Sequence, residues 1–145
     1  MSNESNFTKM TASISTLGFT GVTFDFWWMC AGSADAYGEV YYSLNGGSTW
    51  TLKQSNLNNV TSWSQTAISD PAWDNQSSLM FAFRFVNNTA STAADPAFAV
   101  DELLVTGMSA TNSITVDDLQ PINAWCFGDV VTMQLTFTSV GTYNS

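Results

Sequence analysis

Carboxylates are the side chains in this sequence with the widest chemical repertoire. The 145 residues include twelve Asp and Glu, three Lys and Arg, and no His. Without His, neither a Ser-His-Asp nor a Cys-His relay can form, and His-ligated zinc is excluded. The remaining route to catalysis is a glycosidase pair of carboxylates about 5 to 10 Å apart in a cleft. Asp101 and Glu102 are neighbours on a predicted strand and face opposite sides, so the sequence predicts a protein that is not an enzyme.

Aromatic residues near polar ones offer a second kind of chemistry, the binding of sugars. Tyr37, Trp63 and Trp73 lie in or beside predicted loops, where an aromatic face can stack on a sugar ring. Asn75 and Gln76 follow Trp73 and offer amide groups for hydrogen bonds. The alternative is that these rings pack beneath the loops, because Trp is highly buried on average.

The charge balance limits the classes of partner. The net charge is −9, and the only basic residues are Lys9, Lys53 and Arg84. Phosphate backbones and anionic membrane surfaces need more Lys and Arg, so we expect neither a nucleic acid nor a membrane as partner. No stretch is long and apolar enough to insert into a membrane. A polar surface of Ser, Thr, Asn and Gln, low in charge, is typical of an extracellular or cell-surface protein.

The segment from Glu39 to Leu52 (EVYYSLNGGSTWTL) predicts a β-hairpin, because Asn-Gly between two alternating runs favours a tight turn. Its residues Ser43, Asn45, Gly47, Thr49 and Trp50 resemble the Asp-box, Ser-x-Asp-x-Gly-x-Thr-Trp, with Asn in place of Asp. In that motif polar side chains hydrogen-bond the turn and the Trp packs under it, so the resemblance implies a structural hairpin. Sialidase propellers repeat the box, but this chain has one copy and a single Arg.

The rest of the chain predicts an all-β fold, since strand-like runs alternate with turn residues and no amphipathic helix is present. Residues 22–30 are apolar on both faces, which indicates a central strand. We expect an edge strand at 63–69 and a polar loop at 53–62. The remaining predicted strands are 7–16, 78–86 and 97–107.

Two details of these strands are specific enough to test. The apolar parity changes within 97–107, which predicts a β-bulge near Asp101 and Glu102. Arg84 is isolated on an outward face of its strand, and we expect it to pair with a carboxylate such as Asp25.

The order of four segments resembles a jelly-roll module. The segments are VTFDFWW, GEVYYSLNGGSTW, LMFAFRFVN and FAVDELLVTG, and together they fall within Phe7 to Gly107. Such modules occur in large secreted surface proteins of gliding and related bacteria, exported by the type IX route. The layout is also similar to cleaved-adhesin, MAM and carbohydrate-binding jelly rolls. The resemblance implies a jelly-roll β-sandwich over residues 1–108. In such modules the position of Asp101 often holds a structural calcium ligand, so Asp101, Asp25 and Asp95 are the candidate Ca²⁺ ligands. Asp35 is a further carboxylate that could approach Asp101. The alternative is that Asp101 accepts backbone N–H groups at the bulge, and no cofactor is then required.

Residues 109–145 contain a linker and two further predicted strands, 113–119 and 129–139. With Pro121, the run Cys126-Phe127-Gly128-Asp129 and the run Gly141-Thr142-Tyr143-Asn144, this short two-strand extension resembles the truncated start of an immunoglobulin-like repeat. Two strands cannot bury a face alone. Cys30 and Cys126 are predicted to be unpaired thiols, with Cys30 buried and Cys126 more exposed. A disulfide that staples the extension to the first domain is the alternative.

Two functions remain open. The first is a non-catalytic extracellular binding or adhesion module that recognises a glycan or a cell-surface partner. The second is a structural spacer or self-assembling subunit, which contacts neighbouring domains of the same polypeptide. The apolar strand 22–30 and the unfinished C-terminal extension motivate the second, because both present surfaces that need a neighbour.

Overall fold

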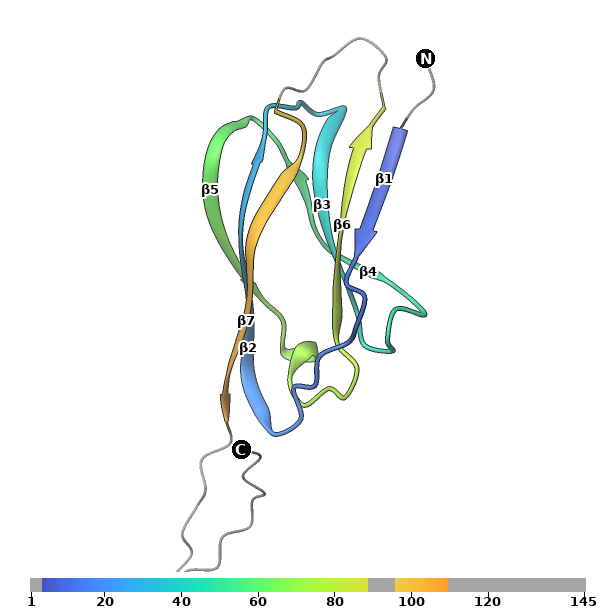
Figure 1. The fold of residues 1–145 in the computed structure, drawn as a ribbon, viewed down its shortest axis with the longest axis vertical. Coiled ribbons are helices and arrows are strands. Elements are labelled where there is room, and N and C mark those ends of the chain that lie inside the picture. The colour runs from blue at the N-terminus through green and yellow to red at the C-terminus, as the bar shows by residue number, and fades with distance from the viewer. Residues whose placement is uncertain (1–3, 89–95, 110–145) are drawn as a thin grey trace, which may run out of the picture. The chain divides into compact units, whose positions relative to one another are not determined.

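The computed structural model describes residues 4–88 and 96–109, and these form an all-β sandwich (Figure 1). The described elements are β1 (Glu4–Lys9), β2 (Phe19–Cys30), β3 (Ala36–Ser43), β4 (Thr51–Leu57), β5 (Val60–Ser69), the 3₁₀ turn η1 (Pro71–Trp73), β6 (Met80–Asn87) and β7 (Ala99–Ser109). One sheet has the order β1-β6-β3-β4 and the other has the order β5-β2-β7. The β-sandwich expected from the alternating strands is therefore confirmed.

The chain divides into two units, Met1–Ala110 and Thr111–Ser145. All described residues belong to the first unit. The strands predicted at 113–119 and 129–139, and Cys126, lie outside the described residues.

The strands pair as one long hairpin folded over itself. β3 pairs with β4, β2 with β5 and β1 with β6, all antiparallel, so each pair encloses the previous one along the chain. Folding this nested hairpin over places alternate pairs in opposite sheets, which is the jelly-roll arrangement. β2 is the central strand of its sheet and β5 is an edge, as expected.

The core lies between the two sheets and is built mainly from aromatic side chains. Along β2 every second residue from Val22 to Cys30 is buried. Phe24 stacks on Phe81 of the opposite sheet, with 4.0 Å between the ring centroids. From the opposite sheet, Phe81 and Phe83 of β6 and Leu79 just before it are buried in this core.

The β-bulge predicted near Asp101 is confirmed. Asp25 of β2 pairs with Leu104, whereas Trp27 pairs with Asp101, so β7 contains one extra residue between these two positions. Glu102 takes a positive φ of 50° there, and its backbone N–H donates to Asp101 Oδ1 at 2.8 Å. The Asp101 carboxylate therefore stabilises the bulge.

Two predicted boundaries are wrong. Residues 53–62 are not a loop, because they complete β4 and begin β5. Their polar composition fits strands at sheet edges, where side chains meet solvent, and the turn between them uses Asn59 at a positive φ. The first strand ends at Lys9 rather than Thr16, and within 10–16 an isolated bridge joins Ile14 to Leu79.

Cys30 is a buried free thiol, as predicted. Burial raises the pKa of this thiol above its ordinary value, which disfavours the reactive thiolate. In a Cys126→Ser variant we expect Cys30 to react with a thiol reagent such as DTNB only after denaturation. Native and denatured absorbance time courses measure this, and equal rates in the two states would contradict it.

Candidate functional site

Trp73 and Asn75, two of the predicted sugar-binding residues, have structural roles. Trp73 is fully buried and packs edge-on against Phe81, so its ring cannot stack on a sugar, and that prediction is wrong. The 3₁₀ turn η1, whose N-cap is Asp70, directs the Trp73 side chain into the core. Asn75 accepts the backbone N–H of Gly18 at 3.0 Å, which ties η1 to the loop before β2. A binding role for Asn75 would compete with this bond.

Trp63 and Tyr37 lie on different sheets. Trp63 lies on the edge strand β5 with 44% of its surface exposed. Tyr37 is half-buried on β3 of the four-stranded sheet. The four predicted ligand-binding residues are therefore not brought together into one site.

Two of the three predicted calcium ligands, Asp25 and Asp101, lie among the residues that the structure describes. Asp25 and Asp101 lie on β2 and β7, opposite Leu104 and Trp27 respectively, and Asp95 lies outside the described residues. Within residues 4–88 and 96–109, no group of three His, Cys, Asp or Glu side chains is placed to hold a metal ion. Calcium binding through Asp101, Asp25 and Asp95 stays a prediction.

A cluster of aromatic side chains does lie on the outer face of the four-stranded sheet. Phe7 contacts Tyr41 and Trp50 edge-on, at centroid distances of 5.6 and 5.4 Å. Phe7 is 42% exposed and Trp50 is partly exposed. We call Phe7, Tyr41 and Trp50 the aromatic platform, which combines an accessible apolar surface with the hydroxyl of Tyr41.

Strand register explains why these residues meet. Phe7 of β1 lies opposite Arg84 of β6, which lies opposite Glu39 of β3. Residues directly opposite on neighbouring strands point to the same face. Val40 and Phe83, the next residues along β3 and β6, are buried in the core. The face shared by Phe7, Arg84 and Glu39 is therefore the outer one.

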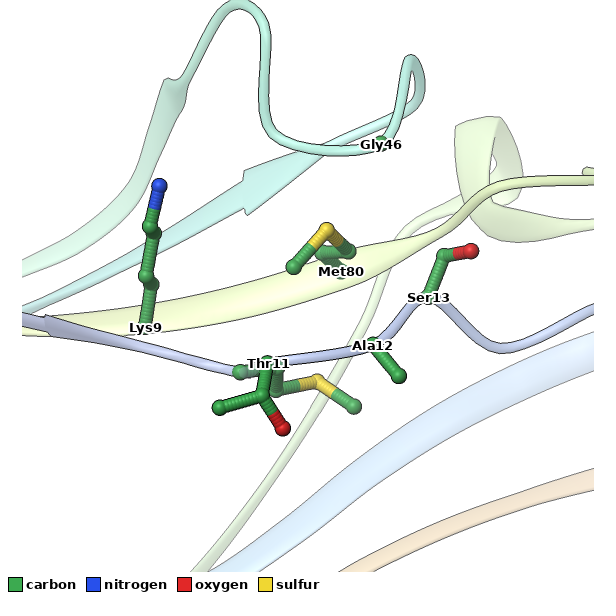
Figure 2. A pocket seen from close by; sticks show the side chains of 7 residues that line it. Lys9, Thr11, Ala12, Ser13, Gly46 and Met80 are labelled. Atoms are coloured by element: carbon green, nitrogen blue, oxygen red, sulfur yellow. The ribbon is translucent and has the colours of Figure 1, made fainter.

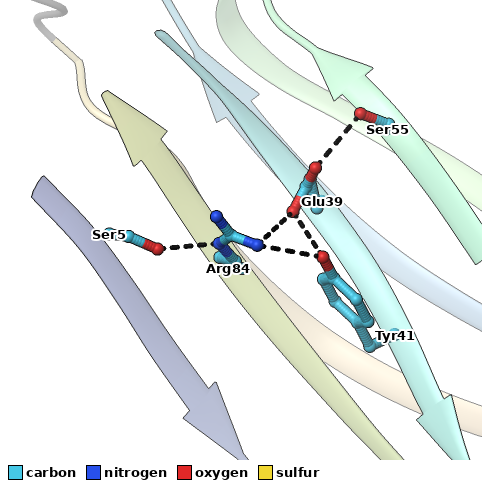
Figure 3. A network of polar contacts seen from close by, with 5 residues as sticks. All are labelled: Ser5, Glu39, Tyr41, Ser55 and Arg84. Carbon is cyan, nitrogen blue, oxygen red and sulfur yellow. Dashed lines mark hydrogen bonds and ion pairs between the residues drawn. The ribbon is translucent and has the colours of Figure 1, made fainter. Parts of the chain in front are cut away.

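Tyr41 of the platform also belongs to a polar network with Ser5, Glu39, Ser55 and Arg84 (Figure 3). The Tyr41 hydroxyl donates to Glu39 Oε2 at 2.8 Å, and Arg84 Nη1 donates to the same hydroxyl at 3.3 Å. Arg84 Nη1 lies 3.6 Å from Glu39 Oε2, and Arg84 Nε donates to Ser5 Oγ at 2.7 Å. Ser55 Oγ donates to Glu39 Oε1 at 3.4 Å. The network therefore links β3, which carries Glu39 and Tyr41, with β1, β4 and β6.

The ion pair corrects the predicted partner of Arg84. Asp25 lies on β2 in the other sheet, and Arg84 pairs with Glu39 instead. Only 8% of the Glu39 side chain is exposed, so its charge depends on these partners. Two effects raise the Tyr41 pKa: the larger is partial desolvation of the hydroxyl, and the second is its hydrogen bond to Glu39. Tyr41 is therefore a neutral hydrogen-bonding group at physiological pH.

A pocket of about 670 Å³ lies where β1 ends, within the size range of small-molecule sites (Figure 2). The segment after β1, the tip of the β3–β4 hairpin and the start of β6 line it, through Lys9, Met10, Thr11, Ala12, Ser13, Gly46 and Met80. Lys9 follows Phe7 by two residues on β1, so its side chain belongs to the same outer face. Lys9 and Arg84 are two of the three basic residues of the chain, and the third, Lys53, pairs with Asp70.

The Asp-box-like hairpin supports one end of the platform. Asn45 Oδ1 accepts from the Thr49 N–H at 2.9 Å and from Ser43 Oγ at 2.8 Å. Ser43 Oγ in turn accepts the Gly47 N–H at 2.9 Å. The Trp50 ring lies against Gly47, where an added Cβ would come within 3.3 Å of it. Asn45 thus fills the acceptor role of the acid in the motif, and the turn holds Trp50 against Phe7.

We expect Asn45→Ala to lower the free energy of unfolding by about 1 to 2 kcal/mol, because it removes the bonds that close this turn. The matched control is Asn45→Asp, which keeps the acceptor oxygens and should change stability by about 0.5 kcal/mol or less. Urea denaturation followed by Trp fluorescence measures both. Equal losses in the two variants would show that the acceptor oxygen is unimportant.

The sequence contained a signal for part of this site. Trp50 belongs to the hairpin motif, and the isolated Arg84 suggested an ion pair. Phe7 and Glu39 had no such signal, because their positions depend on which strands become neighbours. Ser5 and Arg84 are bonded across 79 residues of chain, which no local pattern reveals.

Among the described residues, no helix has the length and apolar character needed to cross a membrane. Comparisons with protein-family models, with curated protein sequences and with solved structures found no match to this chain. The geometry of the outer face is therefore the main basis for a function.

Proposed function

We propose that the chain is a non-catalytic glycan-binding module of an extracellular or cell-surface protein, and that it binds through the aromatic platform. The observation that carries this proposal is the contact of Phe7 with Tyr41 and Trp50 on an outer sheet face. Sugar sites combine aromatic surface with a few fixed polar groups. Here the fixed groups are the Tyr41 hydroxyl and the Arg84 guanidinium, which the network with Glu39 orients.

The pocket beside Lys9 extends this surface. Ser13 lines the pocket with a hydroxyl group and Lys9 contributes an amine, and both can hydrogen-bond to sugar hydroxyls. A glycan chain whose first ring stacks on Phe7 would place a following ring near this pocket. Two neighbouring subsites of this kind favour an oligosaccharide over a single sugar.

We expect Phe7→Ala to weaken glycan binding roughly tenfold, the equivalent of one aromatic stacking contact. Affinity electrophoresis in gels containing xylan, β-glucan, mannan or alginate identifies the glycan, and titration calorimetry with its oligosaccharides gives the affinity. Trp63→Ala is the matched control, because it removes an exposed ring from the other sheet and should leave binding unchanged.

Two outcomes would contradict this proposal. One is the absence of retardation of the parent protein by all four polysaccharides. The other is equal affinity of the parent and Phe7→Ala proteins, provided that circular dichroism and thermal melting show both to be folded.

A self-assembling or spacer subunit is the second candidate function. Leu104 and Met108 on β7 are 56% and 69% exposed, and Trp63 is exposed on the same sheet. Exposed apolar residues on one sheet favour a contact with a neighbouring domain or molecule. Multi-angle light scattering tests the assembly form of this function, which predicts a mass above that of the monomer at micromolar concentration.

A further inference from the structure

The nested pairing leaves one strand without a partner of its own. Three pairs enclose one another, β3 with β4, β2 with β5 and β1 with β6. β7 follows β6, so in the same nested pattern its partner would be a strand that precedes β1. Among the described residues β7 pairs with β2 alone, so it forms an edge of the three-stranded sheet.

Figure 1 shows β7 running alongside β2, at the end of the three-stranded sheet. Val100 and Val105 pair with Trp28 and Phe24, whose side chains are buried in the core, so all four face inward. Val100 and Val105 nevertheless remain only partly buried. A further strand beside β7 would cover this side of the core, and its inward side chains would pack against the two valines.

The β7 backbone offers the hydrogen-bonding groups that such a strand needs. In an antiparallel ladder, alternate residues direct their N–H and C=O groups to opposite neighbours. About half of the groups along the eleven residues of β7 therefore point away from β2. Beyond the bulge, the stretch 103–109 carries no charge that would repel an added strand.

Charge identifies the kind of strand that fits. Asp101 and Glu102 are exposed on β7, and β7 contains no Lys or Arg. A second copy of β7 would bring another acidic pair on a molecule whose net charge is also −9. A segment with basic residues opposite the acidic pair gains attraction there, and like charges directly opposite are destabilising.

We propose that the free edge of β7 is a strand-acceptor site for an extended segment of a partner protein. The segment pairs antiparallel to β7, has apolar residues at the positions that face the core, and carries Lys or Arg near its C-terminal end, opposite Asp101 and Glu102. Main-chain bonds provide the attraction, and the contacts with Val100 and Val105 and with the acidic pair provide the selectivity. This site lies on the sheet opposite the aromatic platform and does not depend on glycan binding.

A synthetic peptide tests the site. The probe is an eleven-residue peptide of alternating Val and Thr, matched to the length of β7, with two Lys near its C-terminus and a fluorescein label. Fluorescence anisotropy against the full chain should show saturable binding. Peptide N-methylated at alternate backbone positions should bind at least tenfold more weakly, since it cannot complete the ladder.

Charge reversal locates the peptide on the protein. Glu102→Lys should weaken binding of the Lys peptide and strengthen binding of a peptide with Glu in place of Lys. Glu4→Lys makes the same charge change on β1 of the other sheet and should leave both affinities unchanged. Hydrogen exchange should show the β7 amides that face away from β2 exchanging freely alone and protected with peptide.

Four results would overturn the proposal. The first is no saturable binding of the Lys peptide. The second is binding that is insensitive to N-methylation or to Glu102→Lys. The third is protection of the outward β7 amides in the isolated monomer, because the edge would then already be paired. The fourth is a dimer that forms without peptide, as measured by sedimentation, and whose outward β7 amides are protected from hydrogen exchange.

Discussion

Phe24→Ala should lower the free energy of unfolding by about 3 to 5 kcal/mol, the usual cost of deleting a buried aromatic side chain. Phe24 is 2% exposed and lies at the centre of the core. Its ring stacks on Phe81 and also contacts Phe26 and Phe83, with centroid distances of 5.3 and 5.9 Å. Alanine leaves a cavity between the two sheets, because the strands on both sides are held by their own ladders and cannot close it.

Urea denaturation at constant pH measures this loss, with the slope of the transition as a check on two-state behaviour. Phe24→Leu is the matched control and should cost about 1 to 2 kcal/mol, since it preserves most of the apolar volume. Phe7→Ala should cost less than Phe24→Ala, because Phe7 is 42% exposed. If Phe24→Ala lost less than 1 kcal/mol, the two sheets would not be packed through this ring.

Glu39→Ala should cost about 2 to 3 kcal/mol, because it removes the acceptor shared by Tyr41, Arg84 and Ser55. Arg84 would keep its charge without a partner, and the Tyr41 hydroxyl would lose its 2.8 Å bond. The cost stays below that of a fully buried ion pair, since 36% of the Arg84 side chain is exposed and water screens its charge.

Two further variants separate charge from hydrogen bonding. Glu39→Gln keeps an acceptor for Tyr41 and should cost about 1 kcal/mol. Combining Glu39→Leu with Arg84→Met removes both charges and should recover most of the loss, because no charge is left unpaired. A double variant as unstable as Glu39→Ala would show that the loss comes from the hydrogen bonds of Tyr41 and Ser55 to Glu39 and not from an unpaired Arg84 charge.

The Glu39 variants also link stability to the proposed function. The network fixes the Tyr41 ring, and Phe7 packs against that ring. Under the proposed function, Glu39→Ala should weaken glycan binding even at temperatures where the protein remains folded. Unchanged affinity would indicate that the ring is held by the sheet alone.

Local patterns in the sequence determined much of the fold. Alternation of apolar and polar residues has the period of a strand, so β2, β3 and β6 were recognisable from their own residues. The turn at Asn45-Gly46 and the bulge at Asp101 were also recognisable, because each depends on the backbone preferences or parity of a few neighbouring residues. The polar stretch 53–62 gave no such signal, so the sequence predicts a loop where most of β4 and the start of β5 lie.

Only the tertiary structure decided where side chains from different strands meet. Trp73 and Trp63 look alike in sequence, yet the η1 turn buries one and the edge position of β5 exposes the other. Arg84 pairs with Glu39 rather than Asp25 because β6 lies beside β3 and not beside β2. The aromatic platform likewise depends on β1 pairing with β6, since strand order is set by packing and hydrogen bonding between residues far apart in the chain and not by the residues of any one strand.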